Sequence, residues 1–133
     1  MCDILCVEIK IKGENMKVLI ISDIHGSGYY AEKIKEIVER ENPEKIVLLG
    51  DLYYHGPRND LPKEYNPKAV IAMLNDMKDE ILCVRGNCDT EVDQMVLQFP
   101  ILADYAFLSL DGLNIFATHG HHHNTTTPPP LTK

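Results

Sequence analysis

Short apolar runs alternate along this chain with segments long enough to form a helix. The runs are Val18–Ile21, Ile46–Leu49 and Ile81–Val84. Continuous apolar runs of this length are typical of strands that are buried on both faces. Strands joined by helical crossovers pair in parallel through right-handed connections. The order strand–helix–strand–helix–strand therefore predicts an α/β domain built on a parallel sheet.

Both connecting segments have the pattern of a helix. The first places apolar residues on one helical face, at Tyr30, Ile34, Ile37 and Val38. The second is expected to begin at Asn66-Pro67, because Asn caps helices well and Pro is favoured at the first helical position. A short helical stretch is expected within Glu91–Gln98.

The pattern changes near the C-terminal end. Tyr105–Leu110 and Leu113–Ala117 flank Asp111-Gly112, a dipeptide that favours a tight hairpin. The hairpin is expected to begin a second sheet. Residues 121–133 read HHHNTTTPPPLTK, a low-complexity tail in which three consecutive prolines exclude a helix or a central strand. The domain is therefore expected over residues 16–120, and residues 1–15 are either an N-terminal extension, such as an extra edge strand, or a mis-assigned start.

Composition narrows the class of protein. The length of 133 residues fits one domain. A net charge of −7 disfavours binding to long nucleic acids or anionic membranes, and no apolar stretch reaches the ~20 residues of a membrane span. The four cysteines match neither a disulfide framework nor paired CxxC zinc ligands. With no signal-peptide pattern at the N-terminus, a reduced, cytoplasmic protein is expected.

Polar residues able to bind a metal follow each expected strand. They lie in Asp23-Ile24-His25, Gly50-Asp51, Gly86-Asn87-Cys88-Asp89 and Thr118-His119-Gly120-His121. Ligands of open α/β sheets bind beyond the carboxyl ends of the strands. Any one of these motifs is explained as well by a turn or a helix cap. Their recurrence at four strand ends predicts a single shared site.

Mixed Asp, His and Asn donors suit divalent ions such as Mn²⁺, Fe²⁺ or Zn²⁺ rather than a thiolate site. Asp51 is expected to bridge two ions, with Asp23 and His25 completing one and Asn87 and His119 the other. Two ions ~3.5–4 Å apart can hold a hydroxide and bind both oxygens of a phosphoryl displacement. The expected nucleophile is thus metal-activated water.

These motifs resemble those of the calcineurin-like metallophosphoesterases. Within that superfamily, two further segments resemble the small bacterial phosphodiesterases of the YfcE type: HGPRND at His55–Asp60 and RGNCDTEVDQM at Arg85–Met95. The resemblance covers Met16 to His121. It implies an αββα sandwich, hydrolysis of small phosphodiesters, and two divalent ions, with Mn²⁺ favoured over Fe²⁺, Zn²⁺ or Ni²⁺. The implied metal ligands are Asp23, His25, Asp51, Asn87 and His119.

The C-terminal segment departs from the family pattern. The resemblance implies about 50 further residues, with a Gly-His-x-His motif that supplies two more ligands. Here the second sheet is expected to be incomplete. Three explanations of the tail stay open: a truncated or frameshifted chain, substitution of the missing ligands by His121–His123, or a disordered tail. The alternative function is a catalytically idle protein-interaction module, as in the retromer small subunit of similar fold, or a truncated remnant.

The remaining site candidates concern proton transfer and phosphate binding. Many superfamily members carry a His general acid where this chain has Cys88. A thiol is a poor proton donor to an alkoxide, so aryl leaving groups are expected to be preferred. The catalytic set is completed by Asp51, Asp89, His55 and His121.

Arg58 and Arg85 are candidate phosphate contacts, since a guanidinium matches phosphate oxygens, although surface Arg residues on loops are common. An exposed sheet edge would leave a homo-oligomer open.

Overall fold

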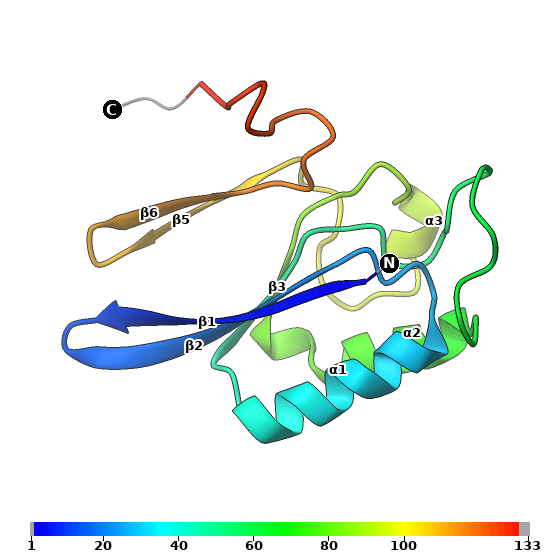
Figure 1. Cartoon of the computed structure of the whole chain (residues 1–133), viewed down its shortest axis with the longest axis horizontal. Coiled ribbons are helices and arrows are strands. Elements are labelled where there is room, and N and C mark those ends of the chain that lie inside the picture. The colour runs from blue at the N-terminus through cyan, green and yellow to red at the C-terminus, as the bar shows by residue number, and fades with distance from the viewer. Residues whose placement is uncertain (1, 131–133) are drawn as a thin grey trace.

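The computed structural model describes residues 2–130 as three layers. Met1 and residues 131–133, which belong to the expected N-terminal and tail segments, lie outside the described residues. Figure 1 shows helices α1 (Gly28–Glu41) and α2 (Pro67–Asp76) on one face of the larger sheet, with a hairpin over the opposite face. The site described below lies at one edge of this sheet.

The larger sheet has the strand order β1-β2-β3-β4. Its strands are β1 (Asp3–Ile11), β2 (Glu14–Ser22), β3 (Lys45–Leu48) and β4 (Ile81–Cys83). β2, β3 and β4 are parallel, which confirms the expected α/β arrangement, whereas β1 runs antiparallel to β2. A short 3₁₀ turn, η1 (Lys78–Glu80), precedes β4, and α3 (Glu91–Gln94) follows it.

The residues upstream of Met16 form an edge strand. β1 and β2 meet through Lys12-Gly13, whose φ angles of 49° and 85° suit a two-residue hairpin turn. Nine residue pairs join the two strands, so β2 begins at Glu14, four residues before the apolar run. The early part of β2 alternates polar and apolar side chains because only one of its faces is covered there.

Both helices begin at a capping side chain, and α2 begins where its sequence predicts. The Asn66 side chain accepts the Ala69 N–H at 3.3 Å, and Pro67 occupies the first helical position. The Ser27 hydroxyl accepts the Tyr30 N–H and so begins α1. The helices bury Ala31, Ile34, Val70, Met73 and Leu74 against Leu19, Ile21 and Leu48 of the sheet. Each large aliphatic side chain buried in this way contributes roughly 1.5–3 kcal/mol.

The second sheet is the hairpin of β5 (Ala106–Leu110) and β6 (Leu113–Ala117). Asp111 and Gly112 form its turn, with φ angles of 48° and 87°, which confirms the expected hairpin. Ala117 packs with Val18 and Val47 across the two sheets. Beside this contact lies an apolar cavity of about 290 Å³. Within residues 2–130 the second sheet has two strands, and no helix covers its outer face.

The described part of the tail is a compact turn. Asn124 Oδ1 accepts the N–H groups of Thr126 and Thr127, both at 2.9 Å, while its amide donates to the Gly120 carbonyl. Residues 121–130 form neither helix nor strand, as the prolines predict. Among the described helices, none combines the length and apolar character needed to cross a membrane.

Candidate active site

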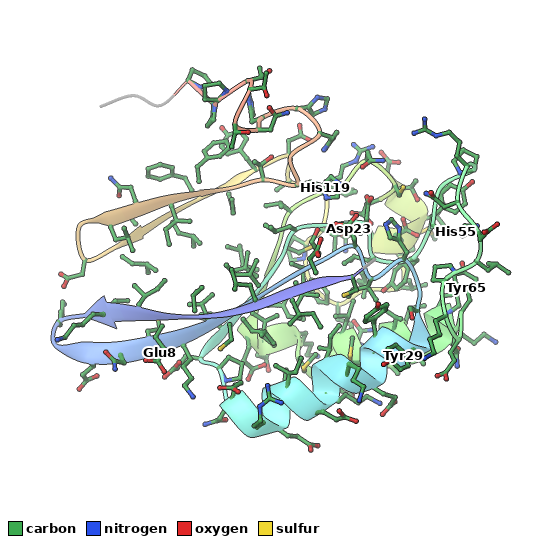
Figure 2. The ribbon with its side chains drawn as sticks, in the orientation of Figure 1. Glu8, Asp23, Tyr29, His55, Tyr65 and His119 are labelled. Carbon is green, nitrogen blue, oxygen red and sulfur yellow. The ribbon has the colours of Figure 1, made fainter. Side chains whose placement is uncertain are left out.

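Loops at the carboxyl ends of four strands converge on one edge of the sheet. Asp23 and His25 follow β2, Asp51 follows β3, Asn87 follows β4, and His119 follows β6. Ligand atoms of Asp23, Asp51 and His119 all lie within 4.8 Å of one another. Figure 2 shows Asp23 and His119 meeting at this edge from the two different sheets. The structure thus brings all five expected metal ligands together.

Two imidazoles are directed at the same carboxylate oxygen. Asp51 Oδ2 lies 3.4 Å from His119 Nε2 and 3.7 Å from His25 Nε2. His25 Nε2 is also 3.2 Å from Asp23 Oδ1, and His119 Nε2 is 2.9 Å from Asn87 Oδ1. These atoms form the centre of the site.

Backbone carbonyls fix the tautomer of both histidines. His25 Nδ1 lies 2.6 Å from the Tyr54 carbonyl, and His119 Nδ1 lies 2.7 Å from the Leu49 carbonyl. A carbonyl can only accept, so each Nδ1 carries the hydrogen and donates. In the neutral ring each Nε2 then presents a lone pair to the carboxylates. Metal-binding histidines in proteins are held in this way, and the donor set fits a divalent cation.

The backbone at three of these residues is left-handed. Asp23, His25 and Asp51 have φ angles of 61°, 49° and 56°. Such conformations are uncommon outside glycine, cost of order 1–3 kcal/mol each, and cluster at functional sites. Hydrogen bonds between the loops hold them: the Asp23 N–H donates to the Gly50 carbonyl at 3.1 Å, and the His25 N–H to the Asp51 carbonyl at 3.0 Å.

Two glycines let the β3 and β4 loops touch. A Cβ atom at Gly86 would collide with Asp51 Oδ1 and with the Asp51 backbone nitrogen. A Cβ atom at Gly50, whose φ is +97°, would overlap the backbone of Gly86. The Gly-Asp and Gly-Asn motifs therefore need glycine for a close approach that places the Asp51 carboxylate.

Asp89 lies beneath the site instead of facing its cavity. It is 1% exposed. Its Oδ2 accepts the N–H groups of Asp51 at 2.8 Å and Gly86 at 2.7 Å, and its Oδ1 accepts the Leu52 N–H at 3.0 Å. The carboxylate thus joins the β3 and β4 loops. The sequence places Asp89 with the catalytic candidates, and the geometry gives it contacts typical of a positioning residue.

Only one oxygen of Asp51 faces the histidines. Its Oδ1 accepts the Cys88 N–H at 2.8 Å, which leaves Oδ2 as the oxygen between His25 and His119. The sequence-based hypothesis has Asp51 bridging two ions, and this bridging stays a prediction. In the structure, Oδ2 lies between the histidines of the two sides of the site.

The expected pairs are in contact, Asp23 with His25 at 3.2 Å and Asn87 with His119 at 2.9 Å, and the division of these donors between two ions stays a prediction. The His, Cys, Asp and Glu ligand atoms also fall into two further groups. Asp51 is shared by two sets, one with Asp23 and His119 and the other with His25 and Cys88. The sequence analysis joined Asp23 with His25 and did not count Cys88 among the ligands. Only the position of Cys88 directly after Asn87 hinted at this placement.

Electrostatics at the site favour a bound cation. Burial opposes ionisation of Asp23, but hydrogen bonds with His25 and Ser22 outweigh it and lower the pKa of the carboxyl. The hydrogen bond with Asp23 raises the pKa of His25, and burial offsets part of that rise. Burial, followed by the Asp51 charge, raises the pKa of Cys88 to about 11, so this side chain is a neutral thiol at pH 7.

The centre opens into a cavity of about 440 Å³, large enough for a small ligand. Arg58 and Tyr54 line it together with four of the five metal-binding candidates, Asp23, His25, Asp51 and Asn87. Arg85 does not line it, because its Nε–H donates to the Asp89 carbonyl at 3.1 Å. Of the two expected phosphate contacts, the structure therefore brings only Arg58 to the cavity.

The two remaining histidine candidates lie outside the cavity lining. The His55 ring packs between Tyr54 and Tyr65, at centroid distances of 5.3 and 5.7 Å. Its Nδ1 is buried and has no hydrogen-bond partner among the described residues. His121 is exposed, with its ring 5.3 Å from that of His119. Partial burial, assisted by His122 and His119, lowers the pKa of His121.

Comparison with known proteins identifies relatives of the chain. It is 45% identical over 106 residues to phosphodiesterase YfcE of Escherichia coli strain K12, and equally to that of strain O157:H7. The alignment covers 80% of this chain and 58% of those proteins, so the chain spans less than two thirds of their length.

A solved structure of YfcE, described as a phosphoesterase from E. coli, superposes with a TM-score of 0.84 at 43% identity. It covers 88% of this chain and 64% of that one. Residues 16–131 match the calcineurin-like phosphoesterase superfamily domain. With the convergent carboxylates and histidines, these matches show that the chain belongs to the calcineurin-like phosphoesterase superfamily.

Proposed function

We propose that this chain carries the metal centre of a phosphodiesterase that acts on small phosphodiesters. The observation that carries the proposal is the approach of His25 Nε2 and His119 Nε2 to one oxygen of Asp51. When both rings are neutral, their Nε2 lone pairs face carboxylate oxygens, an arrangement that a proton or a metal cation stabilises. Asp23 and Asn87 complete the donor set, for which Mn²⁺ is our preferred ion.

Two bound divalent ions would supply Lewis-acid stabilisation of the phosphoryl group and a nucleophilic water at neutral pH. The residues of the chain position the groups that would bind these ions. Asp89 and the two glycines fix the Asp51 carboxylate, and the backbone carbonyls orient the two imidazoles. Arg58 lines the cavity and is suited to pair with a non-bridging phosphate oxygen.

The proposed leaving group is one that departs without a strong acid. Cys88 is the titratable side chain of the β4 loop that lines the cavity, and it is a neutral thiol of high pKa. A thiol transfers a proton to a departing alkoxide poorly, whereas an aryloxide departs with little assistance. We therefore expect faster hydrolysis of aryl than of alkyl diesters.

The proposal also covers the cellular compartment, the size of the substrate and the oligomeric state. All four cysteines are free thiols, which suits a reducing compartment such as the cytoplasm. A net charge of −7 favours a small substrate over a long nucleic acid. Within residues 2–130 both strands of the second sheet have an unpaired edge, so a homo-oligomer stays a prediction that size-exclusion chromatography would test.

The test is hydrolysis of bis(p-nitrophenyl) phosphate by the purified chain, with and without Mn²⁺. We expect turnover that requires the ion and falls at least 100-fold in Asp51→Asn. Asp79→Asn is the matched control, because Asp79 is exposed and lies in η1, away from the cavity lining. It should retain the activity of the parent chain.

A second measurement separates metal binding from catalysis. Electron paramagnetic resonance of free Mn²⁺ should show uptake by the parent chain and by Asp79→Asn, and weaker uptake by Asp51→Asn. Uptake without turnover in a folded chain would contradict the enzymatic proposal and favour a remnant or a binding module. A folded chain that neither hydrolyses the diester nor takes up Mn²⁺ would contradict the proposed metal centre as well.

A further inference from the structure

An exposed aromatic side chain stands at the mouth of the candidate site. Tyr54 is 46% exposed, yet it lines the same cavity as Asp23, His25 and Asp51. A large, partly apolar ring left open beside a polar centre offers contact area to a ligand. Tyr54 lies three residues after Asp51 in the loop that follows β3, and both residues line the cavity.

The backbone of Tyr54 is hydrogen-bonded to the centre. Its carbonyl accepts the His25 Nδ1–H at 2.6 Å, so one hydrogen bond separates the backbone of Tyr54 from a candidate ligand. Its ring meets the His55 ring edge-on, at 5.3 Å and 67°. His55 in turn meets Tyr65 at 5.7 Å and 72°. We call Tyr54, His55 and Tyr65 the aromatic shelf, and Figure 2 labels its last two members on the loop beside Asp23.

The shelf rests on the β2 loop. Tyr65 packs so closely on Gly26 that a Cβ atom there would collide with the Tyr65 ring. The Gly26 N–H donates to the Leu52 carbonyl at 2.8 Å, which connects the base of the shelf to the loop that carries Asp51. The aromatic shelf therefore packs on the same loops that carry the donors.

Arg58 shares the cavity with this ring. It lies four residues after Tyr54 in the same loop, and both side chains line the space that the donors face. A guanidinium recognises phosphate oxygens, and an aromatic face recognises another flat ring. The loop thus presents the two contacts that a phosphate ester of an aromatic alcohol requires.

We propose that Tyr54 is a specificity-determining residue that stacks on an aromatic group attached to the phosphate of the substrate. The inference rests on the proposed function, and it names the substrate class: phosphodiesters with a flat aromatic ring next to the phosphate, in preference to purely aliphatic diesters. Stacking of a ring on an aromatic side chain changes affinity by about 5- to 150-fold in nucleic-acid complexes. We expect a preference of about tenfold here.

The test compares two phosphonates that cannot be hydrolysed. Calorimetry with phenylphosphonate and methylphosphonate, in the presence of Mn²⁺, should give about tenfold tighter binding of the phenyl compound by the parent chain. Tyr54→Phe should keep this preference, because the ring is kept. Tyr54→Ala should reduce it to less than twofold. Tyr105→Ala is the control, since Tyr105 is 55% exposed but does not line the cavity.

Equal affinity for the two phosphonates, binding of neither, or an unchanged preference in Tyr54→Ala would each overturn the inference. The phosphonates are not turned over, so the result is separate from the hydrolysis test. A ring preference without hydrolysis of bis(p-nitrophenyl) phosphate would keep the inference and contradict the proposed function. Hydrolysis without a ring preference would overturn the inference and support the proposed function.

Discussion

Replacement of Asp89 by Asn tests whether one buried carboxylate holds the site together. Asp89 Oδ2 accepts two N–H groups, from Asp51 and Gly86, and Oδ1 accepts a third from Leu52. An Asn side chain can keep its oxygen on the first two, but its amide then faces the Leu52 N–H. The substitution thus leaves one buried donor without an acceptor and removes the charge from two hydrogen bonds.

The magnitude follows from these three contacts. An unsatisfied buried donor costs about 1–3 kcal/mol, and a hydrogen bond to a charged group is worth about 1 kcal/mol more than a neutral one. We therefore expect Asp89→Asn to lower the free energy of unfolding by about 3–5 kcal/mol. Asp89→Ala leaves all three donors unpaired and should cost more, a large share of the 5–15 kcal/mol that is typical of a domain.

Urea unfolding followed by circular dichroism measures this loss. Asp79→Asn, an exposed carboxylate without these contacts, should change the free energy of unfolding by less than about 0.5 kcal/mol. Mn²⁺ affinity, measured without denaturant, should also fall in Asp89→Asn, because the Asp51 N–H keeps only a neutral acceptor and the adjacent Leu52 N–H loses its own, so the Asp51 backbone is held less firmly. Wild-type stability would refute the assignment of the three hydrogen bonds. Lost stability with unchanged Mn²⁺ affinity would refute the positioning role.

Three further substitutions test neighbouring parts of the site. Gly86→Ala should abolish Mn²⁺ uptake in electron paramagnetic resonance, because its Cβ would displace the Asp51 carboxylate; normal uptake would show that the loops can separate freely. Cys88→His should raise the alkyl-to-aryl ratio of diester hydrolysis at least tenfold by adding an imidazole acid, and a constant ratio would mean that leaving-group protonation does not limit the rate. His122→Ala should leave Mn²⁺ affinity within twofold, since His122 is exposed, and a clear weakening would make the tail part of the metal centre.

Much of the fold could be predicted because its determinants are local. The apolar runs that became β2, β3 and β4 have the length and continuity of buried strands, and the Asn66-Pro67 start of α2 is a capping signal. Once parallel pairing is expected, the residues after each strand must meet at one edge. The location of the site therefore needed no knowledge of side-chain contacts.

The internal arrangement of the site depends on features that spacing does not encode. Nothing in the order of residues says that Asp89 turns inward to accept three N–H groups, or that Cys88 groups with His25. Both follow from the close contact of Gly50 with Gly86 and from the left-handed backbone at Asp51. Backbone direction over a few residues decides which side chains face the cavity, and this direction emerges only when the loops pack.

The hydrogen bonds between the β2 and β3 loops explain how the donors can be placed before any ion binds. The N–H groups of Asp23, His25 and Gly26 donate to the carbonyls of Gly50, Asp51 and Leu52, so the parallel pairing of the two strands continues into the loops. This pairing lies within residues 23–52 and needs no contact from the tail. A donor set positioned by backbone pairing loses little conformational freedom when it binds a cation. The part of the site formed by β2 and β3 should therefore be the most preorganised, and the contributions of Asn87 and His119, which come from separate loops, should be the more sensitive to changes elsewhere in the fold.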